Sequence, residues 1–423
     1  MRARFGLGLL FAIFALHTGT LWADGAATFT KADVASIRKQ MHALVDETHA
    51  APGIVTLIIQ RGKTIESDAY GLADAEKGTP MRTDSVMSIA SMTKPVTGVA
   101  MMMLYDQGKW SLDDPVAKFV PELKDLKVMD ADGKLVAPAH APTMRELMSH
   151  TAGFTYGFFG DSAVDKLLVQ TNLLDPGSNL KAFIDKLAGV PLKHQPGTTW
   201  EYSVGVDVQG YIVEKLSGMP YDVFVRERIL KPLKMKDSDF AVLGDARNRI
   251  AFTHNWDKGG KWTIALPPGG RDDVAKRVPG LPMPGGGLYS SAVDYARFCQ
   301  MLLNGGELDG VRLLKPETVA LMHRNVLPAR MHMAVGPTQL PGTGFGLDFA
   351  VVENGAARGD PAPKGTFHWL GIYGTYFWID PTNGLIVIGM IQRDWAPFGG
   401  DPTYDPMLVR DAASKIIYAA LKD

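Results

Sequence analysis

The sequence of 423 residues lacks several features that would assign a chain to a particular class. It contains one cysteine, Cys299, so no disulfide can form within the chain. No group of cysteines and histidines has the spacing of a zinc site, and the metalloprotease pattern H-E-x-x-H is absent. Stability must therefore come from packing. Cys299 follows Phe298 on a helical apolar pattern, and we expect it to fill space in the core.

The charge of the chain also lacks a dominant sign. Lysine and arginine together number 44, aspartate and glutamate number 45, and no long run of either sign occurs. A chain of this kind has no strongly basic surface with which to attract a polyanion. We therefore expect no nucleic-acid partner. With 46% hydrophobic residues, the chain has enough apolar material for a large buried core.

Long apolar runs are absent apart from one at the N-terminus. Arg2 and Arg4 precede an apolar stretch from Phe5 to Leu16, and the small residues Ala23 and Ala26 follow it. This is the layout of a secretory signal, and the stretch is short for a membrane span. We predict that residues 1–23 are a cleaved signal peptide and that the mature protein is periplasmic or secreted, without stable membrane insertion. An uncleaved anchor is the alternative.

The two ends of the chain carry β-rich patterns, each accompanied by a helical one. Near the N-terminus, apolar residues at helical spacing precede a β-rich run at Ile54–Gln60, and near the C-terminus three such runs precede a closing helix. The C-terminal runs are Thr366–Ile372, Tyr373–Ile379 and Leu385–Ile391. We predict an α/β (α+β) fold in which residues 24–90 and 285–423 form one antiparallel sheet flanked by helices.

The middle of the chain, residues 91–284, has mostly helical patterns. Thr143 and Glu146 have the spacing of a capping box, and the pattern at Gly205–Leu216 stops at Gly218. We predict an inserted helical region that forms one unit with the sheet. The stretch at residues 257–287 is rich in proline and glycine, and we expect it to form a rim or lid.

Ser91 opens one of these helices in the segment Ser91-Met92-Thr93-Lys94-Pro95. Residues three apart share a helical face, so the Lys94 amine can reach the Ser91 hydroxyl, and the free N–H groups of the first turn favour negative charge. A serine hydroxyl is a poor nucleophile until a base takes its proton, and a desolvated lysine can be neutral enough to do so. Ser91 and Lys94 are therefore a candidate nucleophile and base.

The pattern S-x-x-K is weak by itself, because it occurs twice more in this chain. Ser36 and Lys39 lie in an amphipathic helical pattern where the lysine is expected to be solvated. Ser178 and Lys181 follow a turn, and Ser178 is expected to be an ordinary helix N-cap. The choice between the three serines depends on the rest of the sequence.

Several segments together resemble the serine β-lactamase-like superfamily, which includes class C β-lactamases, D,D-peptidases and family VIII carboxylesterases. The resemblance runs from about residue 40 to the C-terminus, with its motifs in the family's order. The segments are S-M-T-K-P-V-T-G at 91–98, L-M-S-H-T-A-G-F at 147–154, P-G-T-T-W-E-Y-S at 196–203, G-G-G-L-Y-S-S at 285–291 and G-I-Y-G-T-Y-F-W-I-D-P at 371–381. The resemblance implies a β-lactamase/transpeptidase-like fold and selects Ser91 as the nucleophile.

The resemblance also implies roles for other residues. Tyr202 corresponds to the family's second basic group, which moves a proton between the serine and the leaving group. A phenol near the Lys94 ammonium would have its pKa lowered. The alternative is a core tyrosine. The N–H groups of Ser91 and Ile372 would form the oxyanion hole. Gly371 would let the backbone approach the substrate, or would mark a strand bulge.

Two positions depart from the family's pattern. The asparagine expected two residues after the tyrosine is Val204, and the basic triad K-T-G aligns with Trp369-Leu370-Gly371. Neither Trp369 nor Leu370 can hold a substrate carboxylate through charge or a hydroxyl. A tryptophan at this place resembles the carboxylesterase branch, so we expect Trp369 to line an apolar substrate site. Strand alternation should point His368 away from it.

His150 offers a serine–histidine alternative, because it follows Ser149. Neighbours in sequence rarely form a triad, and the chain has no G-x-S-x-G elbow, which counts against an α/β-hydrolase. We expect His150 to tie a helix end to the following loop.

The sequence therefore predicts a serine hydrolase that works through an acyl-enzyme on a small-molecule ester or amide, in the manner of a carboxylesterase. No metal or cofactor is implied. A β-lactamase or D-amino-acid peptidase or acyltransferase is the enzymatic alternative, and an inactive cell-wall-binding module is the alternative outside enzymes. No pattern indicates an oligomeric state.

Overall fold

The computed structural model describes residues 27–265, 270, 271, 274, 278–336, 338–395 and 404–421. The predicted signal peptide at residues 1–23 lies outside these ranges, as does part of the predicted rim at residues 257–287. Within the described ranges, no helix is both long enough and apolar enough to cross a membrane.

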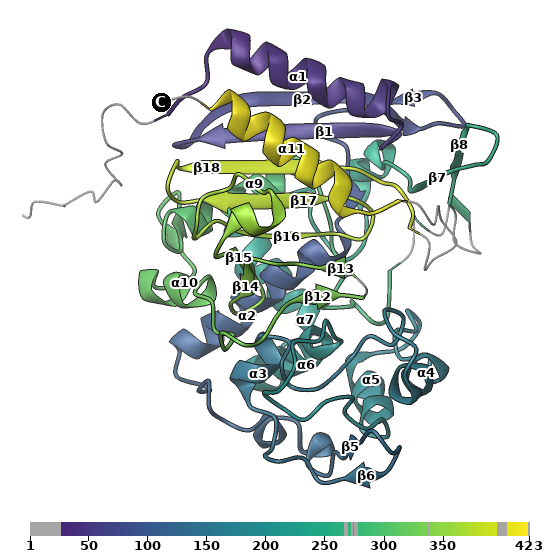
Figure 1. Ribbon diagram of the computed structural model, residues 1–423, viewed down its shortest axis with the longest axis vertical. Helices are drawn as coiled ribbons and strands as arrows, with labels where there is room; N and C mark the ends of the chain where they lie inside the picture. The colour runs from purple at the N-terminus through teal and green to yellow at the C-terminus, as the bar shows by residue number, and fades with distance from the viewer. Residues whose placement is uncertain are drawn as a thin grey trace, which may run out of the picture.

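The central element is an eight-stranded sheet whose neighbouring strands all run antiparallel. Its order is β14-β15-β16-β17-β18-β1-β2-β3, so the N-terminal β1 pairs with the C-terminal β18 (Figure 1). The prediction of one antiparallel sheet built from both ends of the chain is confirmed. The strands are β1 Gly53–Gln60, β2 Lys63–Asp74, β3 Thr79–Pro80, β14 Thr343–Phe345, β15 Ala350–Val352, β16 Phe367–Leu370, β17 Tyr376–Asp380 and β18 Leu385–Met390.

Two helices from opposite ends of the chain cover one face of this sheet. Helix α1 (Lys31–Asp46) begins at a capping box formed by Thr30 and Asp33, and it lies beside α11 (Met407–Ala420) in Figure 1. Both helices bury an apolar stripe against alternate residues of the strands, as the 3.6 and 2.0 periodicities require. This core contains Ile37, Met41, Val45, Ile54, Ile58, Trp378, Val387, Val409, Ala413 and Ile417.

The other face of the sheet packs on the larger core of the molecule. Helix α9 (Ala292–Leu303) lies directly against it and contains the buried Cys299, as expected for core filler. Helix α2 (Thr93–Asp106) packs between the sheet and the helical region and is buried along most of its length. Because α2 begins directly after Ser91, the start of this helix lies where the two regions meet.

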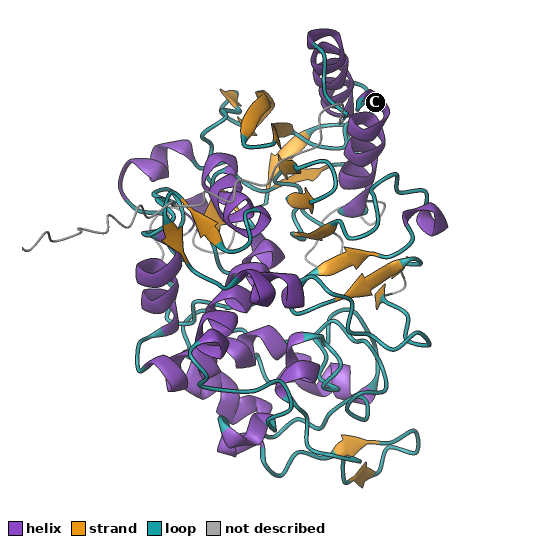
Figure 2. Ribbon diagram, turned by 90° about the vertical axis from the view of Figure 1, so that its left-hand side faces the viewer, coloured by secondary structure: helices purple, strands orange, loops and turns teal. Residues whose placement is uncertain are grey.

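The helical region predicted between residues 91 and 284 lies below the sheet in Figure 1, and Figure 2 shows helices filling most of the lower half. Thr143 and Glu146 do form a capping box at the start of α3, and Gly218 ends α6 in the left-handed conformation at φ 72°. The helices are α3 Met144–Met148, α4 Ala163–Gln170, α5 Leu180–Leu187, α6 Gly205–Ser217 and α7 Tyr221–Val225, which continues as a π-helical turn at Arg226–Leu230.

One segment of the region expected to be helical returns to the sheet instead. The Val86 N–H donates to the Arg249 carbonyl at 2.8 Å, and the His254 N–H donates to the Gln392 carbonyl at 3.0 Å. Residues 249–264 therefore lie beside the segments that follow β3 and β18. They contain β7 (His254–Trp256) and β8 (Trp262–Ile264), which form a separate two-stranded hairpin.

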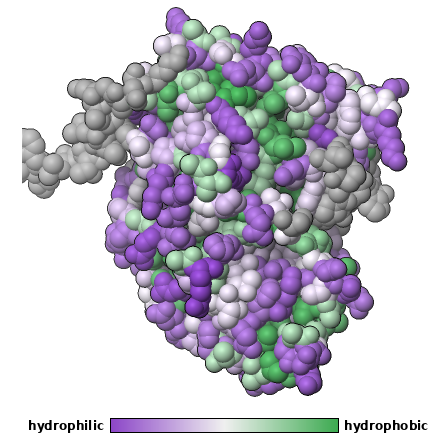
Figure 3. All heavy atoms as spheres, viewed as in Figure 1, coloured by the Kyte–Doolittle hydropathy of each residue, from purple (hydrophilic) through white to green (hydrophobic). Residues whose placement is uncertain are grey.

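The remaining elements are short. They are β4 Met87–Ser88 paired with β9 Tyr289–Ser290, β5 Val128–Met129 with β6 Leu135–Val136, β10 Glu307–Leu308 with β11 Val311–Arg312, β12 Ala334–Val335 with β13 Thr338–Gln339, and α10 Pro316–Met322. Figure 3 shows hydrophilic side chains spread over much of one face, with both hydrophobic and hydrophilic ones at the lower tip.

Candidate active site

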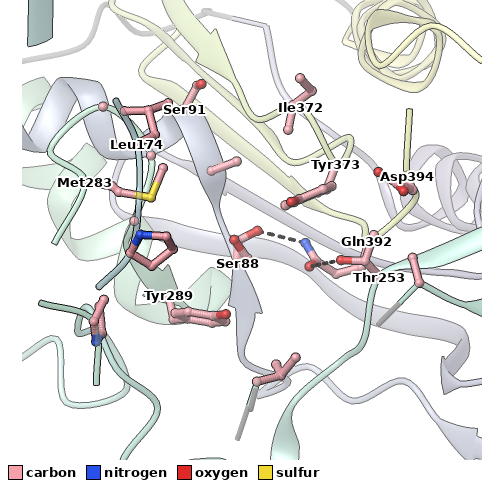
Figure 4. A pocket seen from close by; sticks show the side chains of 18 of the residues that line it. Ser88, Ser91, Leu174, Thr253, Met283, Tyr289, Ile372, Tyr373, Gln392 and Asp394 are labelled. Carbon is pink, nitrogen blue, oxygen red and sulfur yellow. Dashed lines mark hydrogen bonds between the residues drawn. The ribbon is translucent and has the colours of Figure 1, made fainter. Parts of the chain in front are cut away.

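Ser91 lies in a single 3₁₀ turn (Ala90–Met92) between β4 and α2. The residue before it, Ala90, has φ 44°, a left-handed conformation that residues other than glycine rarely adopt. Backbone of this kind persists only where its surroundings hold it in place, and it is frequent at functional sites. Ser91 lines a cavity of about 760 Å³. The turn therefore presents the Ser91 side chain to a space that can hold a ligand (Figure 4).

The Lys94 amine lies one helical turn further on and is buried, with 1% of the residue exposed. Its Nζ is 3.2 Å from Ser91 Oγ and donates to the Gly285 carbonyl at 2.6 Å. Burial lowers the pKa of Lys94 to about 7, although the nearby carboxylates of Asp207 and Asp348 act to raise it. Near neutral pH a substantial fraction of Lys94 is therefore uncharged and able to accept a proton.

Two threonines of α2 hold the segment that contains Gly285. Thr93 Oγ1 accepts a hydrogen bond from the Leu288 N–H at 3.1 Å, and Thr97 Oγ1 donates to the Pro284 carbonyl at 2.7 Å. Gly285 has no room for a side chain, because a Cβ there would lie 2.6 Å from Tyr156 Oη. The G-G-G-L-Y-S-S motif at 285–291 is thus the segment that positions the amine of Lys94.

Tyr202 lines the same cavity and is 7% exposed. Lys94 Nζ lies 4.6 Å from the centroid of its ring, a cation–π distance. The prediction that the Lys94 ammonium lowers the pKa of this phenol is wrong. Burial raises the pKa of Tyr202, the side chains of Ser91 and Trp369 offset this only in part, and the charges of Asp207 and Asp348 raise it further. Tyr202 is therefore a protonated phenol near neutral pH.

The Tyr202 hydroxyl makes no hydrogen bond of normal geometry to any described residue. A buried hydroxyl without a partner is unusual, since most buried polar groups are hydrogen-bonded. Its position beside Ser91 in the cavity leaves it able to exchange a hydrogen bond with a bound ligand.

Sequence reasoning missed three buried groups around Lys94. Tyr156 presents its ring to Lys94 Nζ at 5.0 Å and to the Tyr202 ring at 5.1 Å between centroids. Asp207 Oδ1 accepts from the Gly285 N–H at 2.9 Å, and Asp348 Oδ1 accepts from Gln209 Nε2 at 3.1 Å.

The carboxyl groups of Asp207 and Asp348 are the negative charges that act on the buried Lys94 amine. Burial also affects the ionisation of these two groups. Burial raises the pKa of Asp207 to about 6, and it raises the pKa of Asp348, while the positive charge of Lys94 lowers both. An acidic residue in the first turn of a helix, as Asp207 is, has an ordinary explanation in the helix dipole. No sequence signal distinguished Asp207 from such a residue.

Ile372 lies in the turn between β16 and β17, and it lines the cavity together with Ser91 (Figure 4). Within the described part of the chain, neither the Ser91 N–H nor the Ile372 N–H donates a hydrogen bond. Two unpaired N–H donors beside a nucleophile are what an oxyanion hole requires.

Gly371 does not line the cavity, in contrast to its predicted contact with substrate. A Cβ at this position would lie 2.1 Å from Thr375 Oγ1 and 2.5 Å from the Ile89 carbonyl oxygen. The glycine therefore allows the β16–β17 turn to approach the backbone just before Ser91. That approach brings Ile372 to the site.

Trp369 also differs from its predicted role, because it is not among the residues that line the cavity. It is buried behind Tyr202, with 5.4 Å between the ring centroids, and it contacts Phe345 as well. Leu370 packs on the opposite face of the sheet, with α1 and α11. As strand alternation predicted, His368 is on that opposite face too, where the charges of Arg410 and Asp360 act on it.

His150 follows α3 and has φ 58°. Its Nδ1 lies 3.0 Å from Ser203 Oγ, and its carbonyl accepts from the Glu201 N–H at 2.9 Å. These contacts connect the end of α3 to the segment that leads into Tyr202, which agrees with a structural role for His150.

The two other S-x-x-K segments lie elsewhere. Ser36 and Lys39 are exposed on α1. The expectation that Ser178 caps a helix is wrong, because the N-cap of α5 is Asn179, whose side chain accepts from the Ala182 N–H.

The comparison with known proteins agrees with this arrangement. A sequence profile of the Beta-lactamase family matches residues 35–413, and the chain belongs to that family.

Three similar proteins refine the comparison. Protein Rv1367c of Mycobacterium tuberculosis is 38% identical over 354 residues, covering 81% of this chain and 86% of the relative. Esterase EstB of Burkholderia gladioli is 30% identical over 397 residues, covering 90% of this chain and 96% of the esterase. The solved structure of EstCE1, described as a hydrolase with promiscuous acyltransferase activity, superposes with a TM-score of 0.76 and 25% identity over 92% of this chain and 100% of that one.

Proposed function

We propose that the protein is a serine hydrolase that cleaves carboxylic esters through an acyl-enzyme on Ser91. The observation that carries the proposal is the buried Lys94 amine, 3.2 Å from Ser91 Oγ at the wall of a cavity. A lysine whose pKa is lowered to about 7 can serve as a base for a serine hydroxyl near neutral pH. The relative named as an esterase and the neighbour described as a hydrolase support the same chemistry.

In the first half of the proposed reaction, neutral Lys94 takes the proton from Ser91 Oγ as that oxygen bonds to the ester carbonyl carbon. The carbonyl oxygen becomes an oxyanion and accepts hydrogen bonds from the Ser91 and Ile372 N–H groups, an arrangement in which one donor is typically worth about 3–4 kcal/mol. The C–O bond to the alcohol then breaks. The departing oxygen receives a proton from the Tyr202 hydroxyl, and Tyr202 recovers its proton from Lys94.

In the second half, water takes the place of the alcohol. Lys94 takes a proton from the water as its oxygen attacks the acyl carbon. The bond to Ser91 Oγ then breaks to release the carboxylic acid, and Lys94 returns a proton to Ser91 Oγ. An alcohol in place of water would give acyl transfer by the same steps.

The proposed substrate class is a neutral ester rather than a β-lactam or a D-amino-acid peptide. Trp369 and Leu370 stand where a Lys-Thr pair would hold a carboxylate, and both are packed into the protein. The cavity of about 760 Å³ lies within the range of sites that take drug-sized ligands, so the acyl or alcohol part need not be small.

Turnover of two substrates by the purified protein tests this proposal. A missing charge-assisted hydrogen bond is worth about 1.5–3 kcal/mol, so benzylpenicillin should be hydrolysed roughly 10–150-fold less efficiently than by a true β-lactamase. We expect kcat/KM for p-nitrophenyl butyrate to exceed that for benzylpenicillin by a wide margin. Equal values would overturn the ester preference. Absence of both turnover and labelling by a fluorophosphonate would instead indicate an inactive binding module.

A further inference from the structure

Several polar side chains lie on the side of the cavity across from Leu174 and Met283. Asp394, Gln392 and Tyr373 lie together on this side in Figure 4, whereas Leu174 and Met283 lie across the cavity from them. Thr253 and Asn255, from the segment that enters the β7–β8 hairpin, line the cavity as well. The proposed ester chemistry uses none of these five side chains.

Asp394 is the charged member of this group. It is 6% exposed, and its Oδ1 accepts a hydrogen bond from the Trp395 N–H at 3.0 Å. Among the described residues, the Trp395 N–H is the group that offsets the burial of this carboxyl, and no cation acts on it. Burial raises the pKa of Asp394, and the Asp394 charge together with burial raises the pKa of Tyr373 to about 12.

The neighbouring arginine does not supply the missing cation. Arg393 Nη1 donates to the His49 carbonyl at 2.9 Å, and its guanidinium lies 4.2 Å from the centroid of the Tyr404 ring. Both contacts hold this side chain at the end of the sheet near α1 and α11. Arg393 and Asp394 are therefore neighbours in the sequence but do not form an ion pair with each other in these contacts.

Two amide side chains, Asn255 and Gln392, also belong to this wall. Asn255 Oδ1 is buried and has no hydrogen-bond partner in the described part of the structure. Gln392 uses its amide nitrogen on the Ser88 and Ile391 carbonyls, both at 2.8 Å, and its oxygen accepts from Thr253 Oγ1 at 3.3 Å. The Gln392 amide is thus committed to partners within the protein, and Asp394 carries the charge on this wall.

A buried carboxylate is costly unless a cation or several donors compensate its charge. A hydroxyl group of a ligand would supply one donor and no charge, whereas an ammonium group supplies both. The aromatic ring of Tyr373 beside Asp394 also favours a cation. The buried carboxylate of Asp394 and the neighbouring ring of Tyr373 therefore match a protonated amine better than a sugar-like or other neutral polar group.

We propose that Asp394, beside the ring of Tyr373, forms a subsite for a protonated amine of the substrate, so that the preferred esters carry an ammonium group remote from the scissile bond. This proposal rests on the proposed ester chemistry at Ser91, and it names the substrate class that the cavity selects. The ammonium group would donate to the Asp394 carboxylate while the ester carbonyl lies between the Ser91 and Ile372 N–H groups.

Matched p-nitrophenyl esters test the subsite. One series has acyl chains that end in a primary ammonium group, a second ends in methyl and a third in hydroxyl, each over a range of chain lengths. We expect kcat/KM of the best ammonium ester to fall about 10–100-fold in Asp394→Asn, and that of its methyl counterpart to change by less than about threefold. Asp132→Asn is the matched control, because Asp132 is exposed in the distant β5–β6 hairpin.

The outcomes separate the two proposals. If the methyl esters are hydrolysed and Asp394→Asn leaves the ratio of ammonium to methyl turnover unchanged, the subsite is wrong and the esterase proposal stands. If the loss falls on the hydroxyl esters alone, the ammonium assignment is overturned. If the wild-type protein hydrolyses none of the esters, the proposed esterase function at Ser91 is wrong, and the subsite proposal falls with it.

A measurement on the wild-type protein covers the case in which Asp394→Asn does not fold. Alkylammonium ions should inhibit methyl-ester hydrolysis competitively, with an inhibition constant about tenfold or more below that of the matching alcohol. Equal inhibition by both would contradict the subsite.

Discussion

Lys94 donates a 2.6 Å hydrogen bond to the carbonyl of Gly285, a residue that lies far from it in the sequence. A carbonyl oxygen can only accept, so this bond fixes one N–H of the amine whether Lys94 is charged or neutral. With that N–H fixed, the neutral amine can turn its lone pair toward Ser91 Oγ, 3.2 Å away. The Gly285 carbonyl thus orients the base as well as holding it.

The pH dependence of ester hydrolysis should report the ionisation of Lys94. The lysine must lose its proton before it can act as a base, and its pKa is lowered to about 7. We therefore expect kcat/KM to rise with pH through an apparent pKa of about 7 and to level off above it. The measurement is a pH–rate profile with a p-nitrophenyl ester, followed where nitrophenol absorbs equally in both its forms.

Substitution of Asp207 should shift the apparent pKa of this pH–rate profile in a defined direction. The Asp207 charge raises the pKa of Lys94, so Asp207→Asn should move the apparent pKa below the wild-type value. A profile that moves upward in Asp207→Asn, or does not move, would contradict the assignment of the titrating group to Lys94.

Ser91 should be the residue that becomes acylated. A fluorophosphonate should label the wild-type protein at Ser91, and peptide mass spectrometry locates the adduct. Ser91→Ala should lose labelling and lower ester turnover by more than about 10³-fold. Ser36→Ala and Ser178→Ala serve as controls and should keep both, because neither serine lies in the cavity. An adduct on either of them would disprove the choice of nucleophile.

Tyr202→Phe should separate catalysis from folding. The substitution keeps the ring and its packing, and the Tyr202 hydroxyl makes no hydrogen bond of normal geometry to a described residue, so its removal should leave Tm nearly unchanged. Loss of proton transfer typically costs about 10²–10⁴-fold in rate, and we expect ester turnover to fall by that factor. Near-normal turnover in a folded Tyr202→Phe protein would assign the residue to the core alone.

Gly371→Ala should damage the site through steric contact. The added Cβ would lie 2.5 Å from the Ile89 carbonyl oxygen, and backbone cannot move aside as a flexible side chain can. We expect a lower Tm and a loss of ester turnover as the Ile372 N–H is displaced. Gly189→Ala is the matched control, because its Cβ would meet nothing nearer than 3.5 Å. A wild-type Tm and wild-type ester turnover in Gly371→Ala would contradict the proposal that close backbone approach requires a glycine at this position.

The N-terminus makes a separate prediction about export. We propose that residues 1–23 are removed during secretion. Mass spectrometry of protein isolated from the periplasm or the medium should find a chain that begins near Asp24. Recovery of protein that still carries Met1 in the membrane fraction would support an anchor instead.

Much of the fold could be predicted because its signals are local. The β-rich run at 54–60 and those near 366–391 correspond to strands in one sheet, and the capping box at Thr143 and the stop at Gly218 occur as expected. Residues 249–264 carry no comparable signal. They are held beside the sheet through hydrogen bonds to Val86 and Gln392, which lie far from them in the sequence.

The candidate site was predictable where the motif fixes local geometry and not where burial decides the chemistry. One helical turn is enough to bring Lys94 to Ser91. The pKa of Tyr202 depends instead on how deeply the side chain is buried and on the carboxyl groups of Asp207 and Asp348 nearby. The same holds for Trp369, whose position behind Tyr202 follows from the packing of β16 against the helical region.

The pairing of β1 with β18 has a consequence for biosynthesis. The hairpin of β1 and β2 is made early, but one edge of β1 has no partner until the last strand of the sheet has been synthesised. Ile372 likewise reaches Ser91 only after the β16–β17 turn has been made. Pairings this distant in sequence slow folding and leave strand edges exposed meanwhile. A ribosome-bound chain truncated before β16 should therefore carry Ser91 and Lys94 and still be unable to hydrolyse an ester.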